Sequence, residues 1–185
     1  SSIFRTLSNL SYPLEKVVFG VNNELVEAKF KGMFVTAVFG KINIETGEAS
    51  FVNAGHESIM VFDTNKNFEF IKSEMPPIGI IKYFTESMVK SKTINLKDKT
   101  FVVYTDGVTE GYLKDGQELG ADGVQKIVTN LDIVTPKNLV DSIAKELDWG
   151  AEKLRDDITC LAINIKNTEL VKPERKKKVE GEKKA

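Results

Sequence analysis

Residues 101–110 read FVVYTDGVTE, and this stretch sets the expectations for the fold. Four apolar residues in succession, at 101–104, predict a strand that is buried on both faces. The strand leads to Asp106, so it delivers a carboxylate at its end, and Gly107 then removes side-chain bulk so that a ligand or an ion can approach the backbone. Asp-Gly after a strand is also a common turn signal, and by itself this stretch favours a turn.

A second acidic stretch lies near the end of the chain, where residues 155–159 read RDDIT. Asp156 and Asp157 open a strand predicted over residues 158–165, and by themselves they are typical of a loop or a strand edge. If this strand neighbours the one that leads to Asp106, then Asp106 and Asp156 converge at one end of a sheet. Carboxylates on rigid strands suit a hard divalent cation, because oxygen ligands repel one another until the metal neutralises them.

Segments rich in β-branched and aromatic residues precede the second acidic stretch, and turn-forming residues separate them. Residues 45–47 and 64–65 are hairpin turns by this pattern, and residues 76–79 interrupt it. The predicted strands span residues 34–44, 48–53, 59–62, 68–71, 84–94 and 100–105, with the last two flanking a turn at 96–99.

Helical periodicity marks both ends of this strand-rich region. Apolar residues recur at helical spacing within residues 13–30, and residues 1–9 read as the end of an earlier helix. Apolar residues at 124–131 lie on one helical face, and the next helix begins with Thr135 as its N-cap and Pro136 at its first position. Antiparallel hairpins followed by helices indicate an α+β fold in which helices cover a sheet.

The composition of the chain excludes several kinds of protein. Its 185 residues carry 26 basic and 27 acidic side chains, and 41% are hydrophobic, which fits one domain with a substantial core. No apolar run approaches the roughly 20 residues that a membrane span needs. A single cysteine excludes an internal disulfide or a Cys-rich zinc site, and a single histidine excludes a multi-histidine centre. Carboxylates would therefore bind any metal, which favours Mg²⁺, Mn²⁺ or Ca²⁺.

The C-terminal residues differ in composition from the rest. Residues 172–185 are rich in lysine and contain neither aromatic residues nor an apolar pattern. A basic tail can contact nucleic acid or an anionic membrane, but this composition favours a solvated terminus. We therefore predict a domain over residues 1–166, a basic, disordered tail over residues 167–185, and no nucleic-acid partner. The chain opens with Ser1 rather than Met, which favours a piece cut from a longer protein.

Six short motifs follow one another along the chain. They are FVTA at 34–37, NAGH at 53–56, PIG at 77–79, YTDGVTE at 104–110, Gly120 and DDIT at 156–159. In this order, from about residue 10 to residue 166, they resemble the SpoIIE/RsbU-like branch of the metal-dependent protein Ser/Thr phosphatases, the PPM or 2C-type enzymes. The family usually has Pro where this chain has Glu57 and Leu where it has Ile78, and neither change removes a carboxylate.

The NAGH motif, which contains Asn53, Gly55 and His56, has two interpretations. It could be a strand exit whose histidine hydrogen-bonds nearby backbone, or it could carry a catalytic histidine. The residues alone favour the first, so the motif is expected to be structural.

The resemblance implies a PPM-type α+β fold, an antiparallel β-sandwich flanked by helices, with N-terminal strands missing from this chain. Upstream motifs in the family supply a metal-bridging aspartate and further acids, so the chain looks like the C-terminal portion of the domain. Asp106 and Asp156 match two of the family's metal aspartates, Asp157 would support them, and Gly107 would keep the site open. Two Mn²⁺ or Mg²⁺ ions would activate a shared water that attacks phosphorus, with no protein nucleophile.

The implied activity is hydrolysis of phosphoserine or phosphothreonine proteins, with a phosphorylated anti-anti-sigma-like regulator of bacterial partner switching as the substrate. We expect the chain to be inactive alone and to self-associate, as a homodimer, through sheet surfaces that missing strands leave uncovered. A cytoplasmic location is expected, with tethering to a membrane through upstream domains left open. The alternative is a non-catalytic binding or regulatory module that keeps the phosphatase fold.

Overall fold

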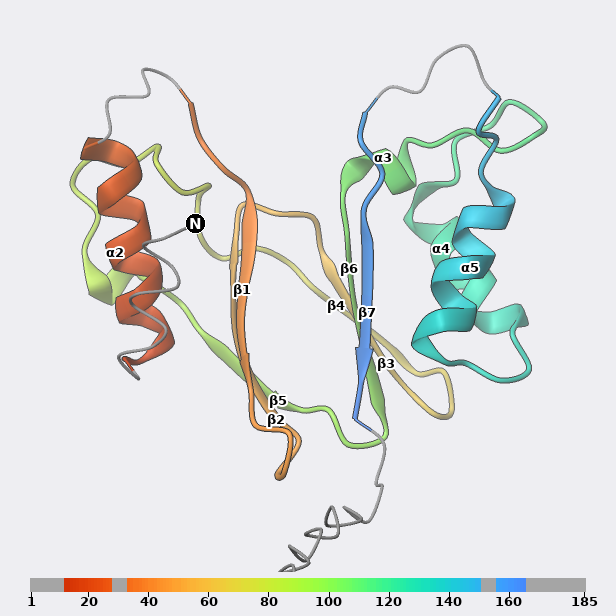
Figure 1. Ribbon diagram of the computed structural model, residues 1–185, viewed down its shortest axis with the longest axis horizontal. Coiled ribbons are helices and arrows are strands. Elements are labelled where there is room, and N and C mark those ends of the chain that lie inside the picture. Colours follow the sequence, from red (N-terminus) through yellow and green to blue (C-terminus); the bar gives the residue numbers. More distant parts are fainter. Residues whose placement is uncertain (1–11, 28–32, 151–155, 166–185) are drawn as a thin grey trace, which may run out of the picture.

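The computed structural model describes residues 12–27, 33–150 and 156–165, and Figure 1 shows how their helices and strands are arranged. The helices are α2 (Leu14–Glu27), the one-turn α3 (Asp106–Thr109), α4 (Gly120–Asn130) and α5 (Pro136–Glu146), with a 3₁₀ helix, η1, at Glu86–Met88. The strands are β1 (Ala37–Ile42), β2 (Glu48–Ala54), β3 (Ile59–Asp63), β4 (Phe68–Ile71), β5 (Lys92–Asn95), β6 (Lys99–Tyr104) and β7 (Cys160–Asn164).

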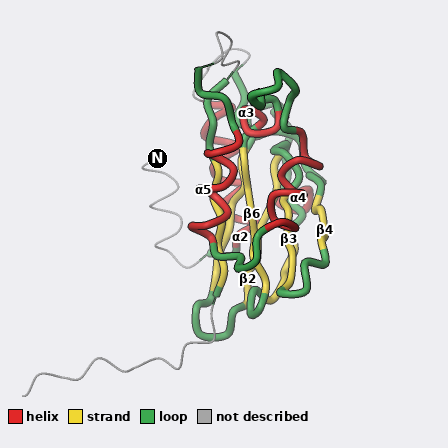
Figure 2. The backbone as a smooth tube through the Cα atoms, turned by 90° about the vertical axis from the view of Figure 1, so that its right-hand side faces the viewer, coloured by secondary structure: helices red, strands yellow, loops and turns green. Residues whose placement is uncertain are grey.

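The strands form two antiparallel sheets that face each other. The first sheet has the order β1-β2-β5, and the second sheet has the order β4-β3-β6-β7. Helix α2 packs on the outer face of the first sheet, and Figure 2 shows α4 and α5 lying over the second sheet. The layers therefore run helix, sheet, sheet, helix, which confirms the predicted α+β sandwich flanked by helices.

Alternation along the strands lets each sheet contribute to two cores. In β6, Val102 packs with α4 and α5, whereas Phe101 faces the first sheet. In β2, Val52 packs with α2, whereas Phe51 faces the second sheet. The rings of Phe51 and Phe101 meet edge to face between the sheets, with their centroids 5.2 Å apart. The prediction that β6 is buried on both faces is therefore confirmed.

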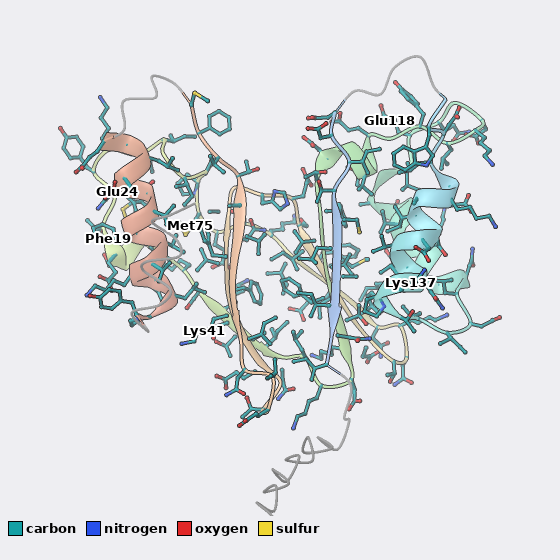
Figure 3. All side chains as sticks on the ribbon, viewed as in Figure 1. Phe19, Glu24, Lys41, Met75, Glu118 and Lys137 are labelled. Carbon is teal, nitrogen blue, oxygen red and sulfur yellow. The ribbon has the colours of Figure 1, made fainter. Side chains whose placement is uncertain are left out.

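Helix α2 is also fixed by a buried polar side chain, Asn22, which is 2% exposed. Its Oδ1 accepts a hydrogen bond from the Gly79 backbone N–H at 2.9 Å, and its Nδ2 donates to the Ile81 carbonyl at 3.4 Å. The helix thereby holds the loop that follows the PIG motif. Figure 3 shows Met75 between α2 and the first sheet, where it belongs to the same core.

The start of α5 agrees with its sequence signals. Thr135 Oγ1 accepts a hydrogen bond from the Asn138 backbone N–H at 3.1 Å, and Pro136 occupies the first position of the helix. At the same end of the α4–α5 pair, where α4 ends, Lys66 Nζ donates to the carbonyls of Thr129 and Leu131, each at 2.7 Å. These contacts are favourable because the last carbonyls of a helix have no partner within it.

One predicted strand is largely wrong. The sequence predicts a strand over residues 84–94, but β5 covers only Lys92–Asn95, and η1 lies before it. The apolar pattern there has another cause, because Phe84 and Val89 belong to the core beneath α2. The turn at 96–99 also joins strands of different sheets, since β5 pairs with β2 whereas β6 pairs with β3 and β7.

The hairpins β1–β2 and β3–β4 and the strands β6 and β7 confirm the other strand predictions. The helix end predicted at residues 1–9, the last residues of the helix predicted at 13–30 and the tail at 167–185 lie outside the described residues. None of the helices in the described part of the chain combines the length and hydrophobicity that crossing a bilayer requires.

Candidate metal site

The candidate site lies at one end of the sandwich, where β6 ends and β7 begins. These strands are antiparallel neighbours, with Tyr104 opposite Cys160, so the condition under which Asp106 and Asp156 converge is met. Asp106 follows β6 and Asp156 precedes β7, and the antiparallel register brings both to the same end of the sheet. We call this end of the sandwich the acidic end.

Thr105 joins the two segments that carry the aspartates. Its backbone N–H donates to the Thr159 carbonyl at 3.0 Å, and the Thr159 N–H donates to Thr105 Oγ1 at 2.9 Å. The same hydroxyl donates to the Asp157 carbonyl at 2.9 Å. Sequence reasoning missed this role, although a threonine at the end of a paired strand, directly before the acid, was a visible signal.

The carboxylates of the acidic end are exposed and are oriented by the backbone. Asp106 Oδ1 accepts from the Gly107 N–H at 2.9 Å, and Asp156 Oδ1 accepts from the Asp157 N–H at 2.7 Å. Among the described residues, the second oxygen of each carboxylate has no hydrogen-bond partner. Asp157 itself is exposed, and its backbone makes the contacts that fix the loop.

Gly107 has a different role from the one that the sequence predicts. A Cβ atom at this position would lie 2.6 Å from the Asp157 carbonyl oxygen and 3.2 Å from that of Asp156. The missing side chain therefore does not leave space open for an ion. It allows the two acidic segments to pack backbone against backbone, which brings Asp156 next to the turn that carries Asp106.

The potential metal ligands at the acidic end are of the type that a hard cation prefers. Asp106, Asp156 and the nearby carbonyls offer only oxygen, which Mn²⁺ and Mg²⁺ prefer. Within the described residues, no three His, Cys, Asp or Glu side chains gather closely enough to hold a metal ion. The described residues could therefore supply two carboxylates to a metal ion, but they do not form a complete coordination shell.

The sulfur of Cys160 lies near the same end but has no thiolate character. Burial raises the pKa of its thiol to about 11, so the reactive anion is scarce at neutral pH. Burial, followed by the charges of Glu57 and Cys160, also raises the pKa of Tyr104. Neither group is therefore available as an anionic nucleophile at neutral pH.

The NAGH motif lies at the exit of β2, as predicted. His56 donates its backbone N–H to Asn53 Oδ1 at 3.0 Å, and its ring Nδ1 lies 3.3 Å from Thr36 Oγ1. The expectation that the imidazole hydrogen-bonds nearby backbone is therefore wrong, because its partner is the side-chain hydroxyl of Thr36, the residue before β1. Asn53 and Gly55 make hydrogen bonds that hold the exit of β2 in place.

Comparison with known protein families shows to which family this chain belongs. The model of the family described as Stage II sporulation protein E (SpoIIE) matches residues 1–166. The chain belongs to the SpoIIE family. Its similarity to Protein IcfG of Synechocystis sp. is 29% identity over 134 residues, which is 71% of this chain and 20% of that protein. The chain thus spans about a fifth of the length of this relative.

Solved structures show the same fold. The PP2C phosphatase domain of Bacillus subtilis SpoIIE, solved with a fragment of its regulatory domain, matches with a TM-score of 0.68 and 15% identity, over 89% of this chain and 48% of that one. The RsbU and RsbW domains of a Mycobacterium tuberculosis protein match with a TM-score of 0.64 and 18% identity, over 89% and 46% of the two chains. At these identities the likeness establishes a PP2C-type fold for this SpoIIE-family chain.

Proposed function

We propose that this SpoIIE-family chain is part of a Mn²⁺- or Mg²⁺-dependent protein serine/threonine phosphatase. The observation that carries the proposal is the pairing of β6 with β7, which places Asp106 and Asp156 at one end of a PP2C-type sandwich. Two similar structures support the choice of metal. One B. subtilis SpoIIE phosphatase domain is a manganese-presoaked form, and a structure of RsbX is a complex with magnesium.

In this proposal Asp106 and Asp156 hold metal, and Asp157 and Gly107 position them. A bound divalent cation lowers the pKa of its water and neutralises phosphoryl oxygens, so it supplies the nucleophile and the charge compensation. Asp106 presents its carboxylate from the first residue of α3, whose backbone fixes one oxygen. Thr105 keeps the Asp156 segment against the end of β6, so the two backbone segments that carry the carboxylates stay side by side.

We further propose that the substrate is a phosphorylated anti-anti-sigma-like regulator in bacterial partner switching, and that the protein acts in the cytoplasm. A second function, a binding or regulatory module without catalysis, is favoured by the lack of a third acidic ligand in the described residues. The test is Mn²⁺-dependent release of phosphate from a phosphoserine protein, by a form of this chain joined to the family's upstream acidic motifs. Absence of hydrolysis by a folded protein would favour the binding module.

We expect the 185-residue chain alone to bind Mn²⁺ weakly, with a Kd on the order of a millimolar or higher, and to hydrolyse phosphoesters barely or not at all. The reason is that Asp106 and Asp156 supply only two carboxylates and water must supply most other ligands. Electron paramagnetic resonance of free Mn²⁺ measures the affinity. A micromolar Kd that Asp106→Asn does not change would contradict the assignment of Asp106.

We also expect the chain to form a homodimer through the side of the sandwich that is bounded by β1 and β7. Among the strands of the described residues, β1 and β7 are the end strands of their sheets, and between the sheets lies a cavity of about 280 Å³ lined by residues such as Val38, Phe51 and Ile163. Leu161 on β7 is 52% exposed beside it. An unpaired strand next to apolar surface is a template for a second copy.

Sedimentation velocity of Leu161→Lys tests this expectation, because a charge on β7 opposes burial of that strand. The variant is expected to be monomeric at concentrations where the parent chain is dimeric. Tyr83→Lys is the matched control, since Tyr83 is 91% exposed and lies beside residues of α2 such as Asn23. A parent chain that sediments as a monomer at high concentration would overturn the expectation.

A further inference from the structure

The link between β2 and β3, residues 55–58, lies at the acidic end of the sandwich. In the first sheet Ala37 of β1 pairs with Ala54 of β2, so the entrance of β1 and the exit of β2 coincide. In the second sheet Met60 of β3 pairs with Val102 of β6, so the entrance of β3 lies at the end where β6 leads to Asp106. Figure 1 shows this link crossing from one sheet to the other beside the upper end of β6.

Hydrogen bonds fix the conformation of this link. Gly55 has a φ of +67°, and a Cβ atom there would lie 2.5 Å from the ring of Pro77. The Gly55 N–H donates to Ser73 Oγ at 2.8 Å. Asn53, which is 6% exposed, accepts from the His56 N–H at 3.0 Å and donates from Nδ2 to the Glu57 carbonyl at 2.9 Å. His56 is therefore held on a rigid support.

The imidazole of His56 is half-buried and is held by one of its two nitrogens. Nδ1 lies 3.3 Å from Thr36 Oγ1, at the entrance of β1. In the described part of the chain, no group hydrogen-bonds to Nε2. If the Thr36 hydroxyl donates to Nδ1, the neutral ring carries its proton on Nε2, which makes Nε2 a hydrogen-bond donor. A donor at this end of the molecule suits an anion.

We propose that His56 Nε2–H donates a hydrogen bond to the phosphoryl group of the substrate, and that Thr36 is the positioning residue that sets its tautomer. This inference rests on the proposed phosphatase function and adds a phosphoryl-binding residue to it. The alternative is that the ring only ties the entrance of β1 to the β2–β3 link. That alternative predicts an effect on stability without any response to phosphate.

Nitrogen-15 NMR of the imidazole tests the proposal directly in the 185-residue chain, because His56 is its only histidine and its ring signals need no assignment. We expect the Nε2–H tautomer, and a shift of the Nε2 resonance when O-phosphoserine is added with an excess of diamagnetic Mg²⁺ but not when serine is added with the same Mg²⁺. In Thr36→Val the tautomer preference is expected to weaken, and in Thr36→Ser it is retained. An Nδ1–H tautomer, or an Nε2 resonance that ignores O-phosphoserine, overturns the proposal.

Kinetics in the form joined to the upstream acidic motifs separate this inference from the proposed function. His56→Gln is expected to lower kcat/KM about ten- to hundredfold, as loss of a hydrogen bond to a charged group does, and Thr36→Val is expected to lower it less. Thr93→Val is the matched control, since the Thr93 hydroxyl bonds Ser50 Oγ, four residues along β2 from Ala54 at the acidic end. If Asp106→Asn abolishes hydrolysis while His56→Gln stays within twofold of the parent, the phosphatase assignment stands and the role of His56 is overturned.

Discussion

Asp106→Asn is expected to reduce metal-dependent phosphoserine hydrolysis to background, a loss of roughly a thousandfold or more, in the form of the protein joined to the family's upstream acidic motifs. Asparagine keeps the volume of the side chain and the oxygen that accepts from the Gly107 N–H, but it removes the negative charge that holds a cation. Charge compensation by a metal contributes several kcal/mol to such a reaction, and each 1.4 kcal/mol is tenfold in rate.

The same loss is expected for Asp156→Asn, because Asp156 faces the same end of the β6–β7 pair. Asp141→Asn is the matched control: Asp141 pairs with Lys137 on the surface of α5, and such a pair contributes little. Phosphate release measures activity, and circular dichroism verifies that each variant is folded. Full activity of folded Asp106→Asn would refute the metal assignment.

Gly107→Ala is expected to lower the free energy of unfolding by about 2–3 kcal/mol, which is large for the addition of one methyl group. The added Cβ would lie 2.6 Å from the Asp157 carbonyl oxygen, and that backbone cannot move aside without breaking its hydrogen bond from the Thr105 hydroxyl. Because the displaced segment carries Asp156, the substitution is also expected to weaken Mn²⁺ binding further.

Urea denaturation of the chain measures this effect. Gly40→Ala provides a matched control, since a Cβ atom at Gly40 would have ordinary contacts at 3.9 Å or more. The control is expected to change the free energy of unfolding by less than about 1 kcal/mol. Equal stabilities of Gly107→Ala and Gly40→Ala would show that the close approach of the two segments does not matter.

Local patterns predicted much of the fold. The run at 101–104, the turn at 45–47 and the cap at Thr135 each report on neighbours in the sequence, and each is confirmed. The failure at residues 84–91 has a tertiary cause, because Phe84 and Val89 are apolar for burial beneath α2 and not for a strand. Burial in a loop and burial in a strand look alike in the sequence of a short segment.

The candidate site was predictable only in outline. The aspartates were visible as acids at strand ends, and the pairing of β6 with β7 confirms that they share an end of the sheet. The contacts of Thr105 with Thr159 and of Thr36 with His56 join residues 54 and 20 positions apart, so no local pattern contains them. The close packing at Gly107 likewise depends on a segment that lies 49 residues later.

The order of the strands has a consequence for synthesis of the chain. β3 and β4 are made early, but β3 pairs on its other side with β6, and β6 pairs with β7, which is close to the end of the described chain. During translation, apolar residues of β3 such as Met60 therefore stay uncovered until β6 has been synthesised. Chains with exposed apolar residues are prone to aggregation. Asp106 gains Asp156 as a neighbour only when β7 has left the ribosome. The acidic end therefore forms only when β7 joins the second sheet, after all strands of the first sheet have been synthesised.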